Sequence, residues 1–151
     1  TLGMDMEANG YENIRMRGLH LKKSRAEIDR LTEDVEAFCG LGTHMGLPVR
    51  TYSAGMQLRL AFAMSTAVVP EILLMDEVVG AGDARFQDKA QARLDDMVSS
   101  VRILALASHS DDIIRRFCNR ALYLKEGRIM FDGGVDECLA AYHSDCDEAP
   151  A

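Results

Sequence analysis

Two short apolar runs with an amphipathic segment between them constrain the fold more than any other feature of this chain. The runs are "EILLMDE", residues 71–77, and "RILALAS", residues 102–108. Apolar runs of this length that alternate with helices are typical of buried parallel strands, which helices cover on both faces. The segment between them carries apolar residues at helical intervals: Phe86, Ala90, Leu94 and Met97. The sequence therefore predicts an α/β domain.

Helical patterns come before the first run, and a hairpin pattern follows the second. "RALYLKEGRIMFDG", residues 120–133, alternates and turns at Glu126 and Gly127, as hairpins do. Glycines and Pro48 make residues 40–52 a loop, and Ser24 with Glu27 three residues later is a capping-box pattern. We expect helices near residues 10–21, 25–39, 53–68, 84–99, 111–117 and 135–142.

Composition excludes several classes of protein. The chain has 151 residues, 48% of them hydrophobic, which suits one globular domain with a core. Its formal charge is -7 and it has no basic run, so we do not expect a nucleic-acid partner. The longest apolar stretch, residues 58–69, contains Arg59 and is shorter than the roughly 18 residues that a membrane helix needs. The cysteines form no C-x-x-C pair, so we expect reduced thiols, and the N-terminus shows no export signal.

The first apolar run ends in two carboxylates, Asp76 and Glu77. A hydrophobic strand that brings an acid to the sheet edge is how P-loop hydrolases hold magnesium, and the next acid can orient or deprotonate the attacking water. The alternative is a strand that simply ends in a solvated acidic pair. The run alone does not decide between these interpretations.

Ser53 and Gly55 open a helix that is almost wholly apolar. The free N–H groups of a first helical turn, with the macrodipole behind them, form an anion site, and a glycine lets a phosphate approach the backbone closely. The alternative is an ordinary serine N-cap with a glycine that a tight turn allows. This pattern therefore predicts a phosphate-binding helix tip only in combination with others.

Taken in order, these motifs resemble the nucleotide-binding subunit of ATP-binding cassette (ABC) transporters. "ILLMDE" is similar to the Walker B strand with its catalytic glutamate, "GAGD" at residues 80–83 to the D-loop, and "ASHS" at residues 107–110 to the switch-histidine loop. "YSAGM" resembles the signature motif, which here consists of Tyr52, Ser53, Ala54, Gly55 and Met56.

Within that family, the chain resembles the branch that exports cell-surface polysaccharides such as O-antigen, capsule or teichoic acid. That branch carries T-G-R-E-N-I, P-V-K-T-Y-S-S-G-M, D-E-V-L-A-V-G-D and F-x-x-K, where this chain has "NGYENI", "PVRTYSAGM", "DEVVGAGD" and "FQDK". The tyrosine, serine and methionine of the signature discriminate, because most relatives have L-S-G-G-Q. Ala54 departs from the branch, which usually has serine there, and glycine and alanine at residues 80 and 81 depart from the usual D-loop approach.

The resemblance implies a P-loop NTPase-like ABC domain, with a helical signature subdomain at about residues 10–68 and part of the catalytic core at about 70–143. It implies ATP and Mg²⁺ as cofactors, a homodimer, and a membrane permease at the cytoplasmic face of the bacterial plasma membrane. Ser53 and Gly55 would contact the partner's ATP. The remaining roles are Mg²⁺ binding by Asp76, water activation by Glu77, γ-phosphate contact by His109 and communication between sites by Asp83.

A departure from the family limits these expectations. A hydrolase of this class needs a glycine-rich loop that ends in lysine and serine or threonine, and this chain contains no Gly-Lys pair. We therefore expect the 151 residues to be the carboxyl-terminal part of a longer subunit and to be inactive alone. An ABC ATPase with another role and a non-catalytic module that binds a full-length partner remain alternatives. Lys89 receives no role from the sequence.

Overall fold

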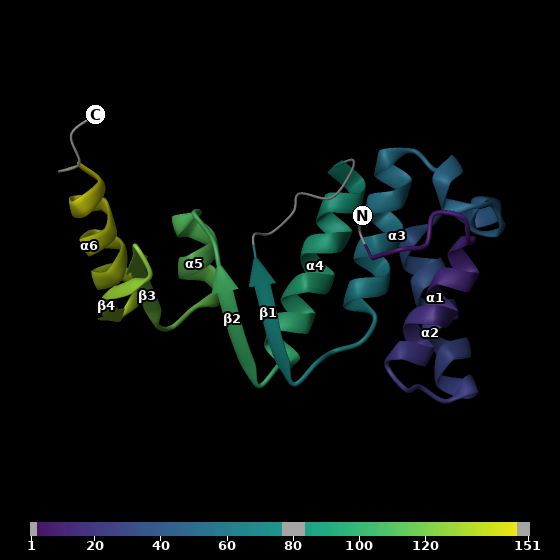
Figure 1. Ribbon diagram of the computed structural model, residues 1–151, viewed down its shortest axis with the longest axis horizontal. Coiled ribbons are helices and arrows are strands. Elements are labelled where there is room, and N and C mark those ends of the chain that lie inside the picture. Colours follow the sequence, from purple (N-terminus) through teal and green to yellow (C-terminus); the bar gives the residue numbers. More distant parts are fainter. Residues whose placement is uncertain (1–2, 77–83, 148–151) are drawn as a thin grey trace. The chain divides into compact units, whose positions relative to one another are not determined.

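The computed structural model describes residues 3–76 and 84–147, and the chain divides into two compact units (Figure 1). The first, helical unit contains Thr1–Pro70 and Val79–Val101. The second, sheet unit contains Glu71–Val78 and Arg102–Ala151. Glu77 and Asp83 lie outside the described residues.

The helical unit contains four α-helices and two short 3-10 helices among the described residues. Their bounds are α1 (Gly10–His20), α2 (Arg25–Cys39), η1 (Gly42–Gly46), η2 (Val49–Thr51), α3 (Ala54–Thr66) and α4 (Ala84–Ser100). The predicted bounds of α2 are confirmed, and the predicted loop at residues 40–52 contains the two 3-10 turns.

Local sequence explains where the first helices begin and end. Ser24 accepts a hydrogen bond from the Glu27 N–H, and the Glu27 side chain accepts one from the Ser24 N–H, so the predicted capping box at α2 is confirmed. Asn9 forms a second capping box with Glu12 at α1. Gly40 ends α2 with φ of 62°, a left-handed conformation that glycine adopts without steric cost.

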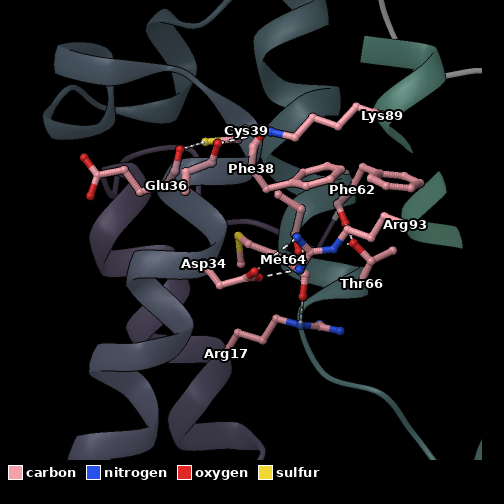
Figure 2. A network of polar contacts seen from close by, with 12 residues as sticks. Arg17, Asp34, Glu36, Phe38, Cys39, Phe62, Met64, Thr66, Lys89 and Arg93 are labelled. Carbon is pink, nitrogen blue, oxygen red and sulfur yellow. Dashed lines mark hydrogen bonds and ion pairs between the residues drawn. The ribbon is translucent and has the colours of Figure 1, made fainter. Parts of the chain in front are cut away.

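The core of the helical unit lies between its helices. Ile14 of α1, Val35 of α2 and Leu60 of α3 are each 0% exposed and belong to one hydrophobic cluster. Arg17 Nε donates to the Met64 carbonyl at 3.1 Å, which links α1 to the last turn of α3 (Figure 2). A cation at the end of a helix satisfies carbonyls that have no intrahelical donor.

The sheet unit contains a parallel strand pair, a hairpin and two helices among its described residues. β1 (Ile72–Asp76) pairs in parallel with β2 (Ile103–Ala107), in a register that places Asp76 opposite Ala107. The antiparallel hairpin joins β3 (Ala121–Lys125) to β4 (Arg128–Gly133). The helices are α5 (Asp111–Phe117) and α6 (Val135–Asp147), of which α6 is longer than the predicted residues 135–142.

The strands are parallel as predicted, but the prediction that they are buried is wrong. Ile72 is 56% exposed, Leu74 75% and Ile103 55%. A parallel sheet buries its residues when other layers cover both of its faces. Here the sheet has two strands in the described part of the chain, and its apolar side chains remain accessible.

Helix α4 belongs with the helical unit, although the sequence division grouped residues 70–143 together. The reason is an aromatic cluster. The Phe86 ring of α4 lies 5.6 Å from the Phe38 ring of α2 and 6.0 Å from the Phe62 ring of α3. In the described ranges, no helix is long and apolar enough to cross a membrane.

Candidate functional site

The tip of α3 exposes backbone at the predicted phosphate-binding position. Ser53 is the N-cap, with φ of -63° and ψ of 160°, and its Oγ accepts from the Met56 N–H at 3.3 Å. Ser53, Ala54 and Gly55 are all exposed. Ala54 and Gly55 are the first two residues of α3. The N–H groups of a first helical turn have no intrahelical acceptor and can bind an external group.

Gly55 leaves open space in front of this tip. A Cβ atom added there would have the Ser53 Oγ as its nearest neighbour, at 4.0 Å, so no other described group crowds the backbone. An anion can approach such a backbone closely, and the helix macrodipole favours it by about 0.3–1 kcal/mol at an exposed site.

Tyr52 supports the tip from inside the core. Its side chain is 5% exposed, and its hydroxyl donates to the His44 carbonyl at 2.8 Å. Burial raises the pKa of Tyr52. Gln57 Nε2 donates to the Tyr52 carbonyl at 3.2 Å and to the Val49 carbonyl at 3.4 Å. The sequence groups Tyr52 with the predicted nucleotide-binding residues, and in the structure its side chain holds the loop before α3 in place.

Asp76 and His109 lie at the same edge of the parallel strand pair. Asp76 is the last residue of β1 and is paired with Ala107, and Ser108 and His109 follow directly. Parallel strands end at one edge of the sheet, so the register brings both candidate residues to that edge. Both residues are exposed. Ser108 Oγ accepts from the Ser110 N–H at 3.1 Å, a hydrogen bond that spans His109.

A cavity of about 280 Å³ borders this edge within the sheet unit. Ser108, His109 and Asp111 line one part of it, and mostly apolar side chains of α5, β3 and α6 line the rest. His143 Nε2 and Asp111 Oδ2 are 2.9 Å apart, and Arg115 Nη1 donates to the same oxygen at 3.4 Å. The hydrogen bond from His143 is the main reason that the pKa of Asp111 is lowered.

One cluster carries a residue to which the sequence gave no role. Lys89 Nζ donates to the carbonyls of Ala37 and Phe38, at 3.1 and 3.0 Å, in the last turn of α2 (Figure 2). Phe86, Lys89 and Arg93 are spaced at intervals of three and four residues, so they share one face of α4. That spacing is a sequence signal that groups these three side chains, although it does not identify their partners on α2.

Comparison with solved structures defines the class of fold. An ATP-binding subunit of an ABC transporter matches 93% of this chain and 58% of its own, with a TM-score of 0.73 and 19% identity. A dimeric ATP-binding cassette in a post-hydrolysis state, bound to ADP and Pi, matches 89% of this chain and 60% of its own, with a TM-score of 0.62 and 21% identity. The fold is that of an ABC ATP-binding domain, represented here in part.

Curated relatives specify the family more closely. The O-antigen export system ATP-binding protein RfbE of Yersinia enterocolitica is 47% identical over 134 residues, covering 89% of this chain and 56% of its own length. The teichoic acids export ATP-binding protein TagH of Shouchella clausii is 33% identical, with coverages of 94% and 39%. The polysialic acid transport ATP-binding protein KpsT of Escherichia coli is 35% identical, with coverages of 95% and 65%.

Over about nine tenths of its length, this chain is similar in sequence to ATP-binding proteins of ABC transporters that are named for polysaccharide export. No family model matches the chain. The chain spans about half the length of the first curated relatives, or less. The shares of their lengths that it covers are 56%, 32% and 39%.

Proposed function

We propose that this chain is part of an ATP-hydrolysing subunit that powers export of a cell-surface polysaccharide or lipid-linked glycan through a membrane permease. The observation that carries the proposal is the 47% identity to an O-antigen export ATP-binding protein. The exposed tip of α3 and the polar edge of β1 and β2 support it, because they carry the exposed backbone and side chains that this chemistry needs.

The tip of α3 binds phosphate in this proposal. The subunit forms a homodimer, and Ser53 with Gly55 contacts the terminal phosphate of an ATP molecule held by the second subunit. The exposed N–H groups and the macrodipole favour that anion. Tyr52, Ala54 and Met56 complete the motif, with Tyr52 acting through its packing against the loop.

The strand edge carries the hydrolytic chemistry. Asp76 would hold Mg²⁺, for which an exposed carboxylate beside substrate phosphates is a suitable ligand. When bound, the ion neutralises negative charge on the phosphates. Glu77 orients and polarises the attacking water, His109 donates a hydrogen bond to the γ-phosphate, and Asp83 links the two sites across the dimer.

The partners follow from the same proposal. The permease is an integral membrane protein, and this subunit acts on the cytoplasmic face of the bacterial plasma membrane as a peripheral protein. Relatives named for O-antigen, teichoic acid and polysialic acid point to a glycan polymer as the substrate class.

The first test is Glu77→Gln in the product of the complete reading frame. We expect the steady-state ATPase kcat to fall at least about a hundredfold, because the water loses its activating carboxylate. ATP should then trap a dimer that size-exclusion chromatography detects. Glu71→Gln, which makes the same change at an exposed acid before β1, is the matched control and should keep the original rate. Continued multiple turnover by Glu77→Gln would remove Glu77 from this role.

The second test places a negative charge at the tip of α3. Gly55→Asp should abolish ATP-dependent dimerisation, because a carboxylate at the tip repels the phosphate. Gly46→Asp is the matched control, since a Cβ atom there would also meet open space. Normal dimerisation of Gly55→Asp would show that this tip does not face a nucleotide.

A further inference from the structure

One face of α4 contacts both α2 and α3. Phe86 is 4% exposed, and its ring lies 5.6 Å from the Phe38 ring and 6.0 Å from the Phe62 ring. The Arg59 guanidinium of α3 lies 5.2 Å from the Phe86 ring centroid. Phe86 therefore contacts side chains of α2 and of α3, the helix that Ser53 begins.

Lys89 caps the end of α2. Its Nζ donates to the carbonyls of Ala37 and Phe38 and lies 4.5 Å from the Phe38 ring centroid. The last carbonyls of a helix have no intrahelical donor, and a cation there is also favoured by the macrodipole. The last turn of α2 contains no basic residue of its own. Lys89 supplies the missing cation from α4.

Arg93 extends this contact by one turn. Its guanidinium lies 4.3 Å from the Phe38 ring centroid. It is paired with Asp34 of α2 through two hydrogen bonds, one of them from Nη1 to Oδ1 at 3.3 Å (Figure 2). The Arg93 side chain is 17% exposed, so most of it is shielded from water. A bidentate arginine–carboxylate pair fixes orientation as well as distance.

We propose that Lys89 and Arg93 are positioning residues, which set the start of α4 relative to the tip of α3. Helix α4 begins at Ala84, directly after Asp83 in the sequence, and α3 begins directly after Ser53. Phe38 is the shared anchor, because it contacts Lys89, Arg93, Phe86 and Phe62. The inference rests on the proposed function, in which Asp83 and Ser53 act at the same dimer interface. A displacement of about 1 Å at such an interface can reduce a rate by up to about a hundredfold.

The test is Lys89→Met in the product of the complete reading frame. Methionine keeps an apolar stem and removes the cation and its donors. At a temperature well below the thermal unfolding midpoint, we expect kcat for ATP hydrolysis to fall about tenfold, with KM for ATP within about twofold of the original. A role in fold stability alone would lower the midpoint and leave kcat per folded molecule unchanged.

Three further variants make the result interpretable. Lys89→Arg keeps a cation that can donate to two carbonyls and should restore most of the rate. Asp88→Asn, at an exposed neighbour on the same helix, should leave kcat unchanged. If Lys89→Met fails to fold, Asp34→Asn weakens the same cluster at a residue whose side chain is 48% exposed and should lower kcat in the same direction.

The outcomes separate this inference from the proposed function. If Glu77→Gln abolishes turnover while Lys89→Met, or Asp34→Asn in its place, retains the original kcat, the positioning role is wrong and the proposed function stands. If Glu77→Gln continues to turn over, the proposed function fails, and the cluster is then a structural contact between helices. A tenfold loss in Lys89→Met with rescue by Lys89→Arg supports the inference.

Discussion

Similar apolar side chains are buried in the helical unit of this molecule and exposed on the strands of the sheet unit. In the helical unit, Ile14, Val35 and Leu60 are 0% exposed. In the sheet unit, Leu74 is 75% exposed and Leu124 61%. The helices enclose a core of their own, whereas the strands leave apolar side chains in contact with water. The exposure of these side chains therefore depends on the layers that surround them and not on their apolar character alone.

The exposed strands have the sequence of strands that are covered on both faces. Apolar residues occupy consecutive positions of β1 and β2, as in parallel sheets that lie between helix layers. An exposed apolar surface of this kind usually marks an interaction site. We infer that the stability of the sheet unit depends on additional contacts much more than that of the helical unit.

Matched leucine truncations test this comparison most strongly. In the 151-residue chain, Leu60→Ala should reduce the free energy of unfolding by about 2–5 kcal/mol, because it leaves a cavity in a closed core. Leu74→Ala should cost less than about 0.5 kcal/mol, since little burial is lost at an exposed position. Urea denaturation followed by circular dichroism measures both. Equal costs would mean that β1 is buried in solution and would break the comparison.

Matched glycine substitutions test how crowded each unit is. A Cβ atom at Gly18 of α1 would lie 2.6 Å from Ile28 Cγ1, so Gly18→Ala should destabilise by about 1–2 kcal/mol despite the helix preference of alanine. At Gly133 of β4 the nearest atom is Phe131 Cε1, at 2.9 Å, on a half-buried ring that can move. Gly133→Ala should therefore change the unfolding midpoint less. The reverse order would contradict a crowded helical unit.

Helix caps provide a third and smaller contrast. Ser24→Ala should cost about 1 kcal/mol, because the Glu27 N–H loses its acceptor at the start of α2. Ser110 precedes α5, and in the described structure its side chain makes no capping hydrogen bond, so Ser110→Ala should have a smaller effect. Thermal unfolding of both variants measures the difference. A larger loss at Ser110 would show that α5 depends on a cap in solution.

The smallest expected effect is a pH dependence at the same cap. The hydrogen bonds from Ser24 lower the pKa of Glu27 to about 2, against about 4.5 in the unfolded chain. Because the folded-state pKa is the lower one, the contribution is present above about pH 4.5 and is lost as the pH falls towards about 2. Glu27→Gln should remove this part of the acid sensitivity. Urea midpoints across that pH range measure it, and identical profiles for the two proteins would contradict it.

Sequence reasoning predicted the local structure well. The bounds of α2 and α5, the turn at Glu126 and Gly127, and the capping box at Ser24 are confirmed. Each depends on residues close together in the chain, whose spacing and turn preferences are visible in the sequence. The tip of α3 was predictable for the same reason, since an N-cap serine and a glycine define it locally.

Other features required the tertiary contacts. Tyr52 belongs to a motif that suggests a ligand contact, yet its side chain lies in the core with its hydroxyl on the His44 carbonyl. Lys89 bonds carbonyls that are 51 and 52 residues away in the sequence. No periodicity of the chain specifies which distant carbonyl a lysine will reach, because that depends on how α4 lies against α2.

The sequence by itself determined the elements, their caps and the order of the motifs, because these arise from interactions within a few residues and from side-chain periodicity. The tertiary structure decided that α4 joins the helical unit, that Tyr52 is buried and that β1 and β2 remain exposed. Burial is a property of the layers that surround a residue, and those layers come from distant parts of a chain.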